Sequence, residues 1–178
     1  MNENEAATER YEWSESRIWL DLYRLLAYFN ASPTLYHLKD DLGIEYQSIQ
    51  NLRASCEKAE IHEVLLKLAA GFRVQQDQQP NIDGQTGPSN VNPWHNDCGL
   101  FWKSVDAPAN EQLTLREACN KIIHATAFEH VYAEQVDPLH YSLAPTTHLY
   151  GERNDKEWKA ELDILKFVDC LFYNYEGA

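Results

Sequence analysis

The sequence predicts a mainly α-helical fold, a helical bundle with a short antiparallel β-hairpin before the C-terminal helix. Three observations predict it. Apolar residues recur every three or four positions in several segments, a helix-capping signal opens the central one, and alternation of apolar and polar residues is confined to the C-terminal part. With 178 residues, 44% of them hydrophobic, the chain can form one domain with its own core, which we place at residues 1–178.

The N-terminal half carries most of the helical signal. In residues 11–30 the apolar face consists of Trp13, Ile18, Trp19, Leu22, Leu25, Leu26 and Phe29. Ser32 followed by Pro33 is typical of an N-cap with proline at the first helical position, so a second helix is predicted to begin there. The apolar period is interrupted at Gly43 and then continues, which favours two or three helices within residues 33–71.

Residues 73–112 have a different composition. The stretch RVQQDQQPNIDGQTGPSNVNP is rich in Gln, Asn, Pro and Gly and has no apolar period, which predicts a long irregular loop within the domain. Trp94, Phe101 and Trp102 follow and are expected to hold this loop against the core. Residues 1–10 are acidic and polar and are expected to form a flexible N-terminus.

The central helix is predicted to begin at Thr114 and to run to about residue 130. Thr114 and Glu117 fit a capping box, in which the hydroxyl and the carboxylate satisfy free backbone N–H groups. The next signal is strand-like: HYSLAP and THLYGE resemble short strands, and residues 157–163 alternate strictly.

The segment GERNDK lies between these strands and has turn composition. Asp163 is expected to cap the final helix. The hairpin that contains Trp158 has two interpretations: it covers one end of the bundle, or it forms a rim that positions a ligand over the neighbouring helix.

Charge and cysteine usage narrow the class of protein. The net charge is −13 and the sequence pI is about 4.8, so the surface as a whole repels nucleic acid and anionic lipid and favours an acidic surface for a protein partner. No run approaches the roughly 18 apolar residues of a membrane span, and no secretory signal opens the chain, so a cytoplasmic protein that does not bind membranes is expected. The four cysteines are widely spaced and are expected to be free thiols.

A polar ridge on the central helix is the main candidate site. Arg116, Asn120 and His124 follow an i, i+4, i+8 spacing, flanked by Glu117. Apolar residues gather on the other side of this helix, so His124 points away from the core. It therefore meets solvent, lines a groove or faces another chain, and a solvated ridge is the ordinary alternative to an active site.

The segment CNKIIHA resembles the signature helix of HEPN domains (higher eukaryotes and prokaryotes nucleotide-binding). The motif of that family is an arginine, often followed by a polar residue, and a histidine four to six residues later. Asn120 and His124 match the last two, whereas Cys119 stands where the arginine is expected and Arg116 lies one turn earlier. The resemblance covers about a dozen residues. It implies an all-α bundle that acts in a bacterial or phage conflict or toxin system.

The resemblance also implies a chemistry, that of a metal-independent RNA endonuclease without cofactors, in which two such helices face each other across a homodimer. His124 would take the ribose 2′-hydroxyl proton, Arg116 would hold the scissile phosphate, and Asn120 would orient one of them. The backbone positions of Arg116 and His124 lie about 12 Å apart along a helix, so the partner chain is an alternative source of the arginine.

Two further functions stay open. The first alternative is a catalytically inactive, acidic interaction protein that binds a protein partner. The second is a helix-turn-helix regulator, because residues 35–53 have the apolar and glycine spacing of that unit, although residues 35–60 carry net negative charge.

His95 and Cys98 could supply two metal ligands, but no second pair stands at a suitable distance, so no metal is expected.

Overall fold

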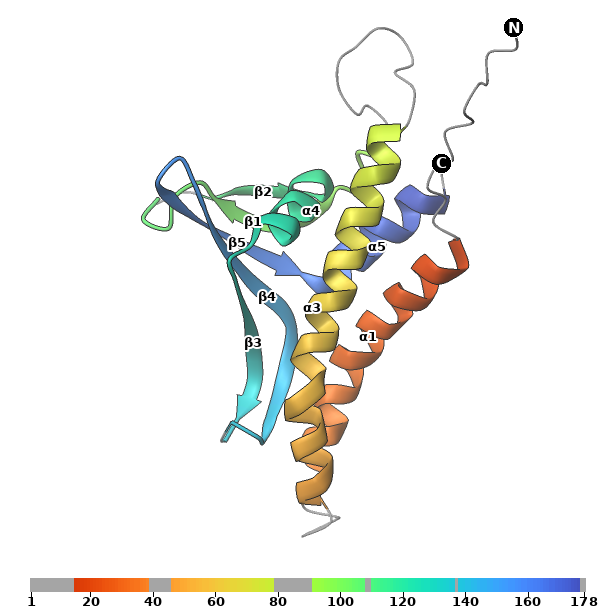
Figure 1. Cartoon of the computed structure of the whole chain (residues 1–178), viewed down its shortest axis with the longest axis vertical. Helices are drawn as coiled ribbons and strands as arrows, with labels where there is room; N and C mark the ends of the chain where they lie inside the picture. Colours follow the sequence, from red (N-terminus) through yellow and green to blue (C-terminus); the bar gives the residue numbers. More distant parts are fainter. Residues whose placement is uncertain (1–14, 39–45, 79–90, 108–109, 137, 177–178) are drawn as a thin grey trace, which may run out of the picture.

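The computed structural model describes residues 15–38, 46–78, 91–107, 110–136 and 138–176. In chain order the elements are α1 (Glu15–His37), α3 (Tyr46–Gln78), β1 (Asp97–Trp102), β2 (Glu111–Thr114), α4 (Leu115–His124), β3 (Ala127–Gln135), β4 (Tyr141–Arg153), β5 (Lys156–Asp163) and α5 (Ile164–Glu176). The predicted helical bundle with a hairpin is therefore wrong. The fold is mixed α/β, with a five-stranded antiparallel sheet packed against helices (Figure 1).

The sheet has the strand order β2-β1-β5-β4-β3, so the consecutive strands β3, β4 and β5 form a meander and β1 adds to its β5 side. Its inner face contributes the fully buried Leu149, Ala160 and Leu162 to a core shared with the helices. In Figure 1 the two long helices α1 and α3 lie to one side of the sheet, and α4 lies between α3 and the strands β1 and β2. Within the residues that the structure describes, no helix is long and apolar enough to cross a membrane.

A second helix does not begin at Ser32, because α1 continues through Pro33 to His37. The Ser32 side chain is fully buried and is used for a tertiary contact instead of a cap. Its hydroxyl accepts a hydrogen bond of 2.7 Å from the Leu143 backbone N–H and another from the Arg53 guanidinium. The interruption predicted at Gly43 lies outside the described residues, as do residues 1–10 and part of the helix-turn-helix segment.

The prediction of an irregular loop over residues 73–112 is wrong in three places. One unbroken helix, α3, extends to Gln78, and the strands β1 and β2 occupy 97–102 and 111–114. Alternation of apolar and polar residues does not reveal these strands, because β2 has only four residues and β1 has an irregular register between Asp97 and Leu100. At this point Gly99 has φ +136, and a Cβ there would meet the Glu161 carbonyl oxygen at 2.0 Å, so only glycine fits.

The central helix is shorter than predicted. Its start is confirmed, since the Thr114 hydroxyl accepts a hydrogen bond from the Glu117 N–H. Its end is wrong: α4 stops at His124, and residues that were placed in the helix up to 130 belong to β3. The Thr126 N–H donates to the Tyr150 carbonyl at 2.8 Å, which starts the pairing of this segment with β4.

The C-terminal signals are largely confirmed. β5 covers the alternating residues, and the Asp163 carboxylate accepts hydrogen bonds from the N–H groups of Leu165 (3.0 Å) and Lys166 (3.1 Å) at the start of α5. The two predicted short strands are one strand, β4. Asn154 and Asp155 connect β4 to β5 with positive φ angles of 54° and 59°, as expected for a tight two-residue hairpin turn.

A buried guanidinium joins α1, α3 and β4. Arg53 on α3 binds Glu57 through Nε at 3.0 Å, and its side chain is only 4% exposed. Its Nη1 donates to the Tyr141 carbonyl at 2.7 Å, its Nη2 donates to the Ser32 hydroxyl, and its Cζ lies 4.2 Å from the centroid of the Tyr141 ring. The three nitrogens of this arginine therefore bind partners on α3, β4 and α1.

We expect Arg53→Met to lower the free energy of unfolding by about 3–5 kcal/mol, because it leaves the Glu57 carboxylate buried without its cation. Urea denaturation followed by circular dichroism measures this. Lys67→Met breaks another i, i+4 pair on the same helix, between exposed groups, and should leave stability nearly unchanged. Equal losses in the two variants would contradict the assignment of Arg53.

Candidate functional site

The side chains of the polar ridge on α4 line neither of the two hollows described below. Arg116 turns toward α3, where its guanidinium donates to Gln76 Oε1 at 2.9 Å and lies 3.6 Å from Asp77. The Asn120 amide lies 3.5 Å from Glu117 Oε2, and His124 is exposed at the last residue of the helix, with no hydrogen bond to any described side chain. The three candidates share one helix, but they do not converge on one point.

The core packing of α4 explains why Cys119 stands where the HEPN motif has an arginine. Cys119 is fully buried in the core, and burial raises the pKa of its thiol above the ordinary range. An arginine at this position would place an uncompensated charge in the core. The HEPN resemblance therefore rests on Asn120 and His124 alone, because the position before Asn120 is the buried Cys119.

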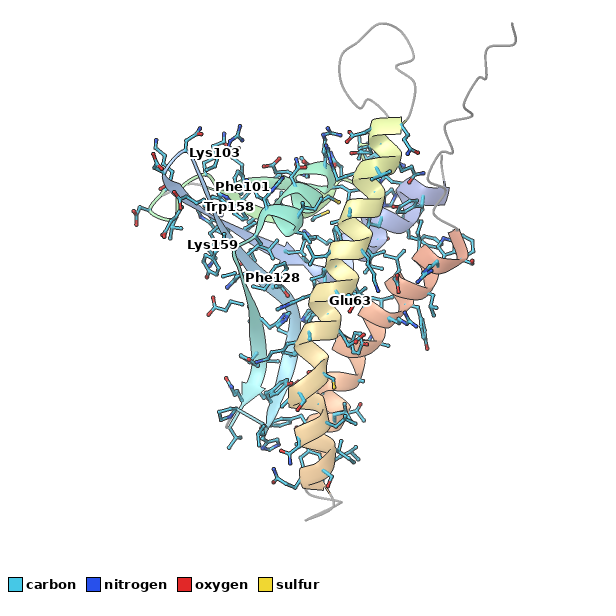
Figure 2. The ribbon with its side chains drawn as sticks, in the orientation of Figure 1. Glu63, Phe101, Lys103, Phe128, Trp158 and Lys159 are labelled. Carbon is cyan, nitrogen blue, oxygen red and sulfur yellow. The ribbon has the colours of Figure 1, made fainter. Side chains whose placement is uncertain are left out.

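A different pair on α4 does line a pocket. Glu117 and Lys121 face the inner surface of the sheet, where Phe101 of β1 and Trp158 of β5 complete a hollow of about 530 Å³. This volume lies within the usual range of small-ligand sites. Figure 2 shows Phe101, Trp158 and Lys103 together at this end of the sheet. The sequence interpretation had selected another face of α4, that of Arg116, Asn120 and His124, and the hairpin around Trp158 does lie next to this helix.

The floor of the pocket is a buried ammonium group. The Lys121 side chain is 8% exposed, and its Nζ lies 4.3 Å from the ring centroids of both Phe101 and Trp158. Its carboxylate partner, Glu117 Oε1, is 3.2 Å away. Gly151 makes room for the indole, since a Cβ there would meet the Trp158 ring at 2.2 Å. The faces of the two rings and the Glu117 carboxylate together surround the ammonium group with negative partial and formal charge.

Cations form the rim. Arg153 and Lys156 are direct cross-strand partners at the end of the β4–β5 hairpin, and both are exposed. Neither forms an ion pair with a described carboxylate, whereas Lys103, directly after β1, is paired with Glu111 at 2.6 Å. The described lining thus contains four cationic and two anionic side chains, an excess of two positive charges on a chain with a net charge of −13.

The residues considered as metal ligands are separate. His95 stacks on Tyr173 with ring centroids 3.7 Å apart and binds Asp169 at 2.9 Å, whereas Cys98 is buried in β1. Among the residues that the structure describes, no three His, Cys, Asp or Glu side chains are arranged to hold a metal ion.

A second hollow, of about 450 Å³, lies between α1 and α5 and is lined mainly by apolar side chains. Trp19, Tyr23 and Phe172 are among them and are partly exposed. Nothing in the described residues shows what covers this groove, so it adds no chemistry to the site.

Two histidines form a close contact between α3 and β3. His62 Nε2 lies 3.1 Å from His130 Nε2, and His130 Nδ1 lies 3.0 Å from the Thr147 hydroxyl. Burial, with the nearby His62 and Lys58, lowers the pKa of His130 to about 4, and burial and Lys58 also lower the pKa of His62. Both rings are therefore neutral at pH 7, and one donates to the other.

Comparison with known proteins adds no family to this description. No family model matches the chain, and neither the curated proteins nor the solved structures contain a significant match. The inference about function therefore depends on the geometry of the pocket and its charges.

The histidine pair predicts a pH dependence of stability. Between pH 6.5 and about 4 the unfolded chain binds a proton at His130 that the folded protein does not, so stability is full above pH 6.5 and falls as the pH decreases through this window. The contribution of His130 is at most about 3 kcal/mol. Chemical denaturation between pH 4 and 7.5 should show a smaller slope in His130→Gln than in the wild type. His124→Gln, an exposed control, should keep the wild-type slope, and an unchanged slope in His130→Gln would refute the assignment.

Proposed function

We propose that the protein is a binding module for an anionic ligand, with its site in the pocket between α4 and the sheet. The observation that carries this proposal is the buried Lys121 ammonium below two exposed cations, Arg153 and Lys156, that have no described carboxylate partner. Charged groups recessed in a low-dielectric wall interact with a ligand more strongly than groups on an open surface.

The free pocket carries an electrostatic strain that an anion would relieve. Like charges directly opposite each other on neighbouring strands destabilise a sheet, and Arg153 and Lys156 are such a pair. The chain as a whole has a net charge of −13, so a local excess of positive charge is not a general feature of the chain. Binding an anion between these two side chains replaces their repulsion by two favourable contacts.

RNA cleavage in a conflict system, which the HEPN resemblance implies, remains a prediction. It needs Arg116 to leave Gln76 and Asp77, or a second copy of the chain to supply a cation beside His124. Incubation with RNA in EDTA tests it. Cleavage by the wild type that leaves 2′,3′-cyclic ends and is lost in a folded His124→Ala variant would support it. Absence of cleavage by the folded wild-type protein would exclude it. The acidic interaction protein also remains a prediction.

Anion binding predicts that inorganic phosphate or benzoate perturbs the backbone amide signals of the α4 pocket in a two-dimensional NMR titration. The double variant Arg153→Gln/Lys156→Gln should bind these probes at least about tenfold more weakly, because each charge-assisted hydrogen bond contributes about 1.5–3 kcal/mol. Binding should weaken between 20 and 300 mM NaCl, since the rim is screened by salt.

The matched control is Arg17→Gln/Lys67→Gln, which removes one exposed and one partly exposed cation outside the pocket and changes the net charge equally. It should retain wild-type affinity. Equal weakening in both double variants would show that the probes respond to net charge, and the proposed site would be rejected.

A further inference from the structure

We infer that the ligand is a small organic phosphate monoester, bound as a dianion. This inference rests on the proposed anion-binding function and narrows it to one chemical class. Its first support is charge matching. The described lining carries an excess of two positive charges, and a phosphate monoester above its second pKa, near 6, carries about two negative charges. A carboxylate or a phosphate diester carries one and would leave a cation uncompensated.

The arrangement of donors is the second support. The guanidinium of Arg153 presents a planar fork that matches two oxygens of a phosphate group, and Lys156 opposite it supplies a point charge for the third. Thr114, at the N-terminal end of α4, also lines the pocket. Three strong acceptor oxygens need donors from several directions, and the hairpin end and the start of α4 approach the pocket from different elements.

The size of the pocket is the third support. A volume of about 530 Å³ is in the range of sites for drug-sized molecules, far larger than a phosphate group needs. The space beside the rim is bounded by Phe101 and Trp158, whose rings offer an apolar boundary to an organic group. A monoester places its charged end at the rim and its carbon body against these rings.

Three probes that share one ring test the inference by isothermal titration calorimetry: phenyl phosphate, methyl phenyl phosphate and benzoate. We expect phenyl phosphate to bind at least tenfold more tightly than the other two at pH 7.5. No histidine is among the described lining side chains, so an affinity that rises from pH 5 to 7.5 reports the second ionisation of the ligand. Phenyl phosphate should lose this preference at pH 5.

The outcomes separate the two levels of the proposal. Equal affinity for the three probes would overturn the monoester inference and leave anion binding intact. No binding of any probe would overturn both. A 5′-phosphorylated oligonucleotide that binds more tightly than phenyl phosphate, when its 5′-hydroxyl counterpart does not bind, would overturn the small-molecule assignment and favour a nucleic-acid end.

Single variants at the rim test whether Arg153 and Lys156 cause the preference for phenyl phosphate over benzoate. Arg153→Gln and Lys156→Gln change exposed side chains at a hairpin end, so the fold should tolerate both. Each should reduce the ratio of phenyl phosphate to benzoate affinity at least fivefold, because one unpaired cation then remains at the rim. Lys67→Gln should leave the ratio unchanged, and an unchanged ratio in both rim variants would overturn the inference.

Discussion

The packing of α1, α3 and β4 depends on the guanidinium of Arg53, which joins these three elements at one point in the core. Removing a charge from water is unfavourable unless its donors are satisfied, and here a carboxylate, a hydroxyl and a backbone carbonyl satisfy them. This geometry requires β4 to lie against the two long helices. Because β4 is the strand that carries the hairpin to β5, the same contact sets where the cationic rim of the pocket lies relative to α4.

The sequence predicted correctly those helix starts and strands that are determined by residues close together in the chain. Thr114 and Asp163 cap the helices that follow them, and the alternation of 157–163 marks β5. The missed strands β1 and β2 depend on partners distant in sequence: a bulge and a four-residue length leave no period to detect. Ser32 looked like a cap because its real partners, Leu143 and Arg53, are supplied only by the folded chain.

The same limit applies to the candidate site. Helical spacing placed Arg116, Asn120 and His124 on the polar side of α4, and the structure confirms that His124 is exposed. Spacing could not show that Lys121 is buried, because the rings that surround it, Phe101 and Trp158, come from the strands β1 and β5. A lysine one turn after Glu117 resembles an ordinary surface ion pair until the sheet is placed beside it. The hairpin composition around Trp158 was the one sequence signal that pointed toward this place.

The position of the rim at the end of a hairpin has an evolutionary consequence. Arg153 and Lys156 flank a two-residue turn and are exposed, whereas Lys121, Phe101 and Trp158 are buried. Ligand preference can therefore drift by exchange of the residues from 153 to 156 while folding stays intact. Descendants of this chain could keep a common scaffold and a common anchoring ammonium and still diverge in the molecules that they recognise.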